Sequence, residues 1–511
     1  MNKEKCKQID EKRDDLYLKK LAGITKKAGI TAFGSFFLLI LSFITNAVIT
    51  RSLGADQYGL YVLSTRVLEI FMMIASFGFG LTIVRTVSFQ HAVGNHSRIK
   101  GTINYSFKAL LVTSVFLVVA GFMFNKMISV RLFHRPELSP LLGILLLSVP
   151  ITTMTLVAVS ALNGLKKIRE SVLVTNVINP LQFLILAVFV LQMDYGLKGL
   201  VWVFTFTGIT GLFFAWFFLN KIYLSRYKTE KAYHASGELW RFSTPLFFNQ
   251  LLNNAVRWIP VFVMGFYLSN SEIGIFNVAL KISLLVSFAL GAFQLIFAPV
   301  MAEQFALKNS TIINQLNKTI TKWIFSSALM VFSILFLYSN TFLEIFGTEF
   351  KAGKIILIIL MTGELINAGV GLAGNLLIMS GRPQLAFVNS LVSFFLVSLL
   401  SFMLIPVYGA KGAAFAIAAA VLLVNLLRIC EIWYLEKIHP FRSSFVKPVV
   451  AAALSAVIVL SLNHSFSSVT VYGAAGGMVL FTVIFILVIW ILRPDDEDRF
   501  ILKQLKRYFK K

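Results

Sequence analysis

A row of amide side chains followed by an arginine gives this sequence its clearest binding chemistry. Amide groups hydrogen-bond hydroxyls, and a guanidinium group pairs with a phosphate. The spacing is that of one helical face, so we expect a single polar stripe on an otherwise apolar helix. The stripe lies in TPLFFNQLLNNAVRWIP and comprises Asn249, Gln250, Asn253, Asn254 and Arg257. We interpret it as a candidate site for a ligand that carries sugar hydroxyls and a phosphate.

Two further cations lie inside apolar runs, at equivalent positions of an internal repeat. LGADQYGLYVLSTRV (53–67) aligns without gaps on LSNSEIGIFNVALKI (268–282), which places Arg66 on Lys281. A Lys or Arg at the centre of a membrane costs roughly 2.5–3.5 kcal/mol on insertion scales. Such residues therefore usually face a protein interior or a water-filled cavity, where an anion neutralises them. We expect Arg66, Lys281 and Arg257 to bind an anionic ligand in such a cavity.

Structural interpretations of the same charges stay open. Glu69 follows Arg66 by three residues, so the two also fit an ion pair within one helix. No acidic residue follows Lys281 by three positions. Its long side chain could instead extend towards the external face, so that the ammonium group reaches the membrane surface. Glu69 and Glu364 are the candidates for ion coupling, although Glu364 fits a hydrogen-bonded structural role equally well. The sequence contains no metal-ligand cluster, no cofactor motif and no catalytic candidate.

The elements that position these residues are membrane-spanning helices. The chain has 511 residues, of which 57% are hydrophobic and only 14% charged, a balance that excludes a soluble domain. Backbone polar groups in hydrocarbon must pair internally, and the apolar runs are too long for barrel strands. The sequence therefore predicts an all-α integral membrane protein with about fourteen spans. They lie near 28–50, 58–84, 103–125, 138–163, 171–193, 198–220, 243–268, 272–302, 320–340, 353–380, 385–405, 410–434, 447–463 and 470–492.

The distribution of basic residues predicts the orientation. The net charge of +24 would also suit a nucleic-acid partner, but most Lys and Arg residues fall in the gaps on the N-terminal side of the membrane. By the positive-inside rule, both termini are cytoplasmic. The cytoplasmic parts are a basic segment at 1–27, a linker at 221–242 and a tail at 493–511. We interpret the tail as a basic amphipathic helix that lies on anionic lipid.

A duplication organises the spans. Besides the pair around Arg66 and Lys281, DYGLKG (194–199) matches VYGAKG (407–412), and LNGLKK (162–167) matches MSGRPQ (379–384). Nearly constant offsets between repeats indicate a six-span unit. We predict two pseudo-symmetric six-helix lobes, 28–220 and 243–434, with two appended helices at 447–492. Transport sites usually lie between such repeats.

Four of these stretches also resemble a known family. RSLGADQYGLY, FGFGLTIVR, FYLSNSEIGIFNVALKI and VYGAKGAA are similar to segments of the polysaccharide transporter family of the MOP flippase superfamily, which includes O-antigen and other lipid-linked oligosaccharide flippases. The resemblance implies a MATE-like fold with a central cavity, in which the cations engage the diphosphate of a polyprenyl-linked glycan. Many family members carry an Asp near the position of Arg257, so this chain departs from the family there.

The resulting hypothesis is a non-enzymatic flippase of the bacterial cytoplasmic (inner) membrane. It would move an undecaprenyl-diphosphate-linked oligosaccharide from the cytoplasmic to the external leaflet by alternating access, for cell-surface polysaccharide synthesis. A polysaccharide polymerase and glycosyltransferases are the expected protein partners. One alternative is an ion-coupled multidrug exporter of the same superfamily, which would favour acids in its cavity. Another is an envelope-assembly scaffold that transports nothing.

Overall fold

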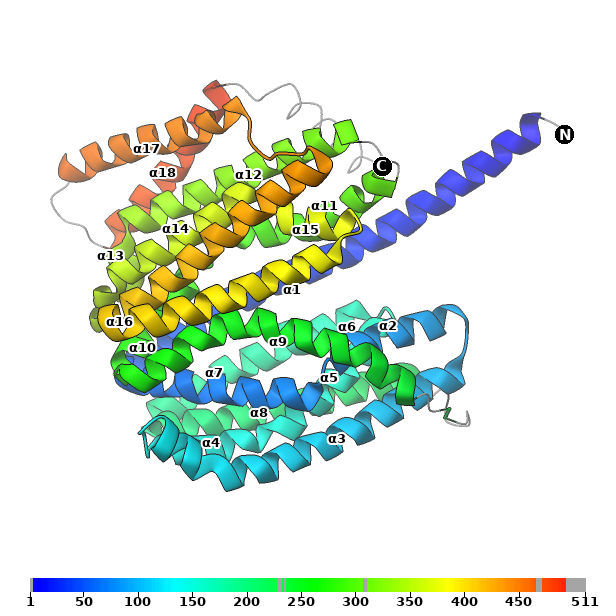
Figure 1. Ribbon diagram of the computed structural model, residues 1–511, viewed down its shortest axis with the longest axis horizontal. Helices are drawn as coiled ribbons and strands as arrows, with labels where there is room; N and C mark the ends of the chain where they lie inside the picture. Colours follow the sequence, from blue (N-terminus) through cyan, green and yellow to red (C-terminus); the bar gives the residue numbers. More distant parts are fainter. Residues whose placement is uncertain are drawn as a thin grey trace. The chain divides into compact units, whose positions relative to one another are not determined.

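The computed structural model of the chain describes residues 3–225, 227, 232–233, 236–306, 310–465 and 471–492. Within these residues all regular structure is helical (Figure 1), which confirms the all-α prediction. The chain divides into two compact units, of which the first comprises Met1–Ser52 and Ser64–Leu251. The second comprises Leu53–Leu63 and Leu252–Lys511, so it includes a short segment from the N-terminal part of the chain.

Most elements of the first unit are α-helices, with three short π-helical turns. They are α1 (Lys3–Ser76), α2 (Phe79–Ala92), α3 (His96–Lys126), η1 (Met127–Leu132), α4 (Leu138–Leu146), α5 (Ser148–Gly164), α6 (Ile168–Val172), η2 (Leu173–Ile178), α7 (Asn179–Gln192), α8 (Gly196–Leu219) and η3 (Asn220–Leu224). Helix α9 (Ser236–Tyr267) contributes its first half to this unit. Residues of the predicted N-terminal segment continue the helix of the first span.

The core of the first unit lies where α2, α3, α5 and α8 meet. Phe79, Ile83, Ile99 and Ile103 are fully buried there. Because neighbouring lipid is as apolar as these side chains, close packing and hydrogen bonds between helices supply the association. One such bond joins the Thr82 hydroxyl of α2 to the Ser243 hydroxyl of α9 at 2.8 Å, and another joins Trp240 of α9 to Tyr105 of α3.

The second unit contains the remaining helices. They are α10 (Asn270–Ser283), α11 (Phe288–Ala306), α12 (Ser310–Leu337), α13 (Ser339–Glu344), the 3-10 helix η4 (Thr348–Gly353), α14 (Lys354–Val370), α15 (Ala373–Met379), α16 (Pro383–Glu436), the 3-10 helix η5 (Ser443–Phe445), α17 (Val446–Ser465) and α18 (Val471–Ile491). Helix α14 packs against α16, and α17 and α18 pack against each other and α12 (Figure 1). Leu329, Val459 and Phe481 are buried in the core that α12, α17 and α18 share.

The helix count agrees with the predicted spans once the kinks are considered. Ten helical stretches of the described chain are long and apolar enough to cross a membrane, and the bent pair α10 and α11 makes an eleventh. Two of the ten, Phe33–Ala92 and Pro383–Glu436, are of double length and each corresponds to two predicted spans. Helix α9, with 32 residues, lies at the remaining predicted span but is not among these apolar stretches, so the count agrees only roughly. The predicted limits of the six-helix lobes stay a prediction.

Glycines mark the kinks of the two double-length helices. The backbone of Gly54 has φ 73° and ψ 174°, and that of Gly409 has φ 59° and ψ −142°. Side chains other than hydrogen strongly disfavour these angles. Gly196, which the repeat equates with Gly409, also has a positive φ of 57°. The glycine of the repeated YG motif therefore has a positive φ at both sites.

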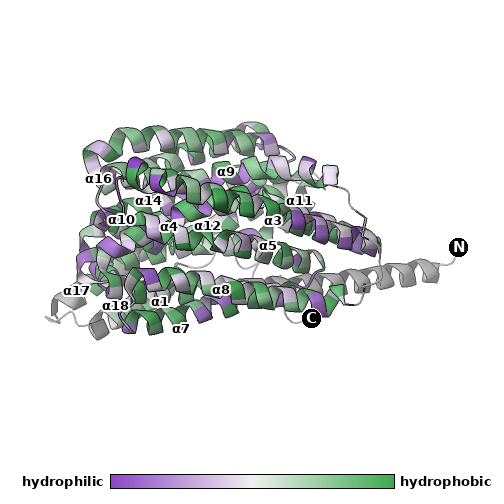
Figure 2. Cartoon of the chain, turned by 90° about the horizontal axis from the view of Figure 1, so that it is seen from below, coloured by the Kyte–Doolittle hydropathy of each residue, from purple (hydrophilic) through white to green (hydrophobic). Residues whose placement is uncertain are grey.

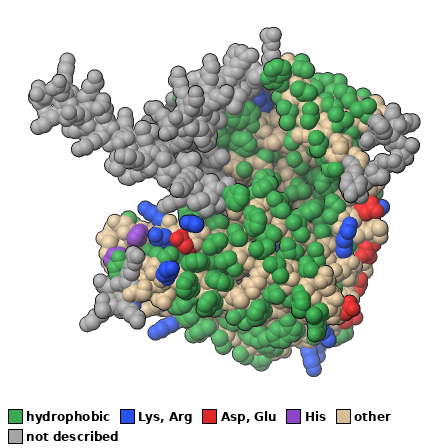
Figure 3. All heavy atoms as spheres, turned by 180° about the vertical axis from the view of Figure 1, so that it is seen from behind, with side chains coloured by type: hydrophobic (Ala, Val, Ile, Leu, Met, Phe, Trp, Pro, Cys, Tyr) green, Lys and Arg blue, Asp and Glu red, His purple; other side chains and the backbone are tan. Residues whose placement is uncertain are grey.

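The hydropathy of the described surface fits a membrane protein. Hydrophobic residues predominate along the helices (Figure 2). On the face shown in Figure 3, hydrophobic side chains cover much of the described surface and charged ones lie towards its margins. The predicted amphipathic tail at 493–511 lies outside the described residues.

Candidate binding site in the membrane helices

The predicted polar stripe lies on α9 and keeps its helical spacing. Asn249, Asn253 and Arg257 are exposed at successive steps of four residues, and Gln250 and Asn254 beside them are half-buried. The Ser390 hydroxyl of α16 donates a hydrogen bond of 3.5 Å to Oδ1 of Asn253. The stripe therefore offers amide and guanidinium groups along one helix, as expected for a ligand rich in hydroxyls.

Arg257 belongs to a larger group that we call the polar network. It comprises Arg257, Ser287, Glu364, Asn367, Asn425 and Arg428, all in the second unit. The side chains of Ser287 and Asn367 lie beside the Glu364 carboxylate, which also interacts electrostatically with Arg257. Helices α9, α14 and α16 and the turn after α10 thus meet around a single carboxylate.

In the polar network, Arg428 donates a hydrogen bond to Asn425, which donates in turn to Asn367. Nη1 of Arg428 donates to Oδ1 of Asn425 at 3.2 Å, and Nδ2 of Asn425 donates to Oδ1 of Asn367 at 3.1 Å. The Asn367 side chain in turn lies beside the Glu364 carboxylate. Arg257 and Arg428 therefore lie at the two ends, with the Glu364 carboxylate between them. Each of these arginines interacts with a carboxylate, Arg257 with Glu364 and Arg428 with Glu431.

The sequence indicated Arg257 and Glu364 but missed the rest of the polar network. Arg428 lies two turns inside the end of α16 and beside Gly374, and the sequence did not indicate it as a candidate. Its interaction with Glu431, three residues onwards, and its bond to Asn425, three residues back, follow helical spacing. This helical spacing is the signal in the sequence that could have indicated both contacts of Arg428. No local pattern predicted that Asn367 of α14 bonds to Asn425 of α16, because the two residues belong to different helices.

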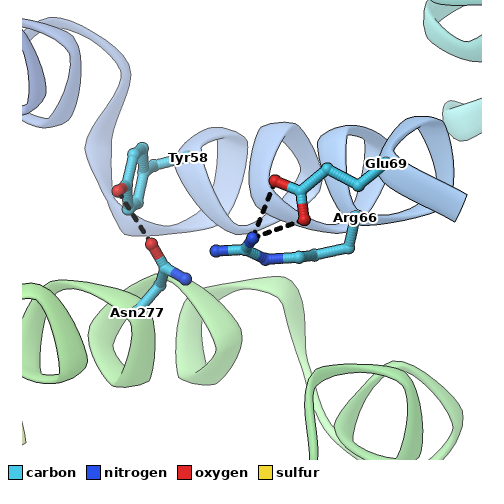
Figure 4. Close-up of polar contacts among 4 residues, drawn as sticks. All are labelled: Tyr58, Arg66, Glu69 and Asn277. Carbon is cyan, nitrogen blue, oxygen red and sulfur yellow. Dashed lines mark hydrogen bonds and ion pairs between the residues drawn. The ribbon is translucent and has the colours of Figure 1, made fainter. Parts of the chain in front are cut away.

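Arg66 forms an ion pair on its own helix (Figure 4). Its Nη1 donates to the two carboxylate oxygens of Glu69 at 2.8 and 2.7 Å. The Arg66 and Glu69 side chains are 22% and 40% exposed, so both remain partly accessible at the surface of the unit. Nε of Arg66 is buried and makes no hydrogen bond to the described residues. The pair expected from the sequence is present, and Arg66 keeps donors that Glu69 does not occupy.

Lys281 contacts an aromatic side chain from a distant part of the sequence. Its Nζ donates to the Tyr58 hydroxyl at 3.2 Å and lies 5.8 Å from the centroid of that ring. The Tyr58 hydroxyl donates to Oδ1 of Asn277 at 3.2 Å (Figure 4), and Tyr58 is fully buried. Lys281 therefore carries its charge within the second unit, where an aromatic face and a hydroxyl stabilise it. No sequence pattern predicted this partner.

The candidates for ion coupling both have cationic partners. Glu69 pairs with Arg66, and Glu364 interacts with Arg257. In the part of the chain that the structure describes, no group of three or more His, Cys, Asp or Glu residues could hold a metal ion.

The fold is that of MOP-superfamily transporters. It matches the lipid II flippase MurJ in its inward-closed conformation with a TM-score of 0.71 and 16% identity, over 90% of this chain and 98% of that one. It also matches an inward-facing multidrug resistance MATE family transporter with a TM-score of 0.66 and 13% identity, over 78% of this chain and 94% of that one. These matches confirm the predicted fold class.

Residues 24–305 match the model of the family described as "Polysaccharide biosynthesis protein", and the chain belongs to this family. A curated relative is the capsular polysaccharide biosynthesis protein CapF of Staphylococcus aureus, 26% identical over 261 residues. That match covers 50% of this chain and 64% of the relative. The membership predicted from the sequence motifs is therefore confirmed. The chain is a multi-pass membrane protein of this family.

Proposed function

We propose that the protein is a flippase that moves an oligosaccharide linked to undecaprenyl diphosphate from the cytoplasmic to the external leaflet. The cargo serves cell-surface polysaccharide synthesis, and the movement proceeds by alternating access. Family membership and the MurJ-like fold support the general class. The observation that carries the proposal is the polar stripe of α9, which ends at Arg257 in the polar network.

The stripe and the polar network match the two polar parts of such a cargo. The amides of Asn249, Gln250, Asn253 and Asn254 hydrogen-bond sugar hydroxyls, and Arg257 binds the diphosphate. A charged bond of this kind contributes about 1.5–3 kcal/mol. The polyprenyl tail stays in lipid, since moving it into a polar site would expose its apolar surface. No bond of the cargo is made or broken, so the protein is not an enzyme.

Arg66, in the first unit, and Lys281, in the second, add positive charge for the cargo. Arg66 uses donors left by Glu69 to bind phosphate oxygens, and Lys281 contributes positive charge from beside Tyr58. Glu364 and Glu69 are the proposed sites of ion coupling. A diphosphate that attracts Arg257 weakens its interaction with Glu364, which leaves that carboxylate available to a coupling cation or proton.

The protein acts in the bacterial cytoplasmic membrane with both termini in the cytoplasm. The basic residues that the sequence places on one side of the membrane support this orientation. The polysaccharide polymerase and glycosyltransferases of the same pathway are its proposed partners, because they would supply and consume the cargo.

A multidrug exporter is the second candidate, because a MATE transporter shares the fold. Exporters of cationic drugs require acidic groups where the drug binds, since opposite charge stabilises a cation in a membrane. In the polar network Arg257 interacts with Glu364, and Arg428 interacts with Glu431. These acids already have cationic partners, which disfavours a cationic drug as the cargo.

The test is the replacement Arg257→Ala in cells whose own copy of the gene has been deleted. Loss of one charged bond predicts at least a ten-fold fall in surface glycan, with unchanged amounts of protein in the membrane. Arg257→Lys should restore part of the export, and Arg131→Ala, at an exposed arginine of η1, is the matched control. Normal glycan export by Arg257→Ala would contradict the role of Arg257.

A further inference from the structure

A second polar pocket lies at one end of the second unit, away from the polar network. It has a volume of about 560 Å³ and lies between the first turns of α12 and the chain that leaves α16. Ser310, Asn314 and Lys318 recur every four residues and present one face of α12 to it. We call it the α12/α16 pocket.

The α12/α16 pocket carries an excess of positive charge. Lys318, Lys437 and Arg442 line it, and Glu436 is its one carboxylate. Oε1 of Glu436 lies 3.6 Å from Nη2 of Arg382, so an arginine outside the lining already balances that acid. Three cations therefore face a cavity that also offers the hydroxyl of Ser310 and the amide of Asn314. This combination is suited to a phosphate group that bears hydroxyls.

The surroundings place the pocket at the level of a membrane surface. It lies where α16 ends at Glu436 and just before α17 begins at Val446, and both helices belong to apolar stretches long enough to span a membrane. Trp433, Tyr434 and Phe441 beside it are 56%, 73% and 50% exposed. Aromatic side chains concentrate at membrane–water interfaces. Basic pockets between helices at this depth are typical sites for anionic lipid head groups.

We propose that the α12/α16 pocket binds the phosphodiester head group of an anionic phospholipid, whose acyl chains lie along neighbouring apolar helices. Lys437 occupies the position that ends α16, with a left-handed backbone (φ 56°), and its ammonium group lies 5.3 and 5.5 Å from the rings of Trp433 and Tyr434. The two aromatic side chains thus hold one of the three cations that line the pocket. This proposal is independent of the cargo.

Thermal unfolding of the purified full-length protein in detergent tests the proposal. The probes are dioleoylphosphatidylglycerol, dioleoylphosphatidylcholine and inorganic phosphate, each titrated separately. The pocket variant is Lys318→Gln, Lys437→Gln and Arg442→Gln combined. The control variant replaces three exposed lysines elsewhere, Lys198→Gln, Lys354→Gln and Lys411→Gln. Lys437→Glu alone is a second pocket variant that serves if the triple variant does not fold.

Phosphatidylglycerol should stabilise the wild type and the control variant at concentrations at least ten-fold lower than phosphatidylcholine does. In either pocket variant, that preference should fall to less than three-fold. An equal response of wild type and pocket variants to phosphatidylglycerol would overturn the proposal. Stabilisation of the wild type by millimolar inorganic phosphate that abolishes the lipid preference would identify free phosphate as the occupant and would overturn the lipid assignment.

Discussion

Single residues of the two repeats share a position but differ in their partners. Arg66 pairs with Glu69 on its own helix, whereas Lys281 binds Tyr58, which is 223 residues away in the sequence. Helical spacing was sufficient to predict the first partner. Nothing in the sequence indicated the second, because a contact between distant helices depends on packing rather than on local periodicity. Arg428 was missed for a different reason, since its nearness to a helix end concealed its bonds to Asn425.

A double-mutant cycle on Arg66 and Glu69 separates a structural role from a binding role. Each single replacement by Ala leaves one charge without its partner and should lower the unfolding free energy by roughly 1–3 kcal/mol, between the values for exposed and for buried ion pairs. The double variant Arg66→Ala, Glu69→Ala leaves no such charge and should recover most of that loss. Thermal unfolding in detergent measures both effects.

The same variants also report on cargo binding. If Arg66 contacts the diphosphate, the double variant should be as stable as expected and still export less than a tenth of the wild-type amount of glycan. Wild-type export by the double variant would restrict Arg66 to a structural role.

At the scale of elements, a close helix crossing stands out. The helical segment 53–63 lies against α10, and the two glycines that the repeat equates, Gly59 and Gly274, meet at the crossing. A Cβ atom on Gly59 would overlap the carbonyl oxygen of Asn270, and one on Gly274 would overlap that of Ala55. The sequence predicted the equivalence of the two glycines. It did not predict their contact, because an alignment of repeats carries no information on which faces touch.

Replacing either glycine by Ala should separate these helices. We expect Gly59→Ala and Gly274→Ala each to lower the unfolding free energy by about 1–3 kcal/mol, the usual cost of overpacking. Gly291→Ala is the matched control, since that α11 glycine has no atom within 4 Å of an added Cβ. Alanine there should be neutral or stabilising, because it favours the helix by about 1 kcal/mol over glycine. Equal unfolding temperatures for all three variants would show that the crossing tolerates a methyl group.

At the scale of the whole molecule, the hydrophobic pattern predicted the helical class and the approximate number of spans. Membrane physics makes this possible, since every span must be long, apolar and internally hydrogen-bonded. The predicted pairs of spans on either side of Gly54 and Gly409 meet at a kink there, where the sequence predicted a polar turn. The pattern did not predict that Leu53–Leu63 belongs to the second unit.

Cysteine labelling in spheroplasts tests the predicted orientation. In a background with Cys6→Ser and Cys430→Ser, an impermeant maleimide should label Ser52→Cys and Tyr408→Cys without permeabilisation. Ala92→Cys, also at an exposed position, should be labelled only after the membrane is opened. These outcomes follow from the bias of Lys and Arg towards one side of the membrane. Labelling of Ala92→Cys in unopened spheroplasts would contradict cytoplasmic termini.

The placement of Leu53–Leu63 in the second unit has a consequence for biosynthesis. At roughly 5–20 residues per second, a ribosome needs about 10–40 s to proceed from this segment to α10. During that interval the nascent chain inserts its early helices while the small-residue face of Gly59 has no neighbour to cover it. Maturation of the first half of the protein therefore has to wait for synthesis of the second, and a prematurely terminated product would present that uncovered face to membrane quality-control proteases.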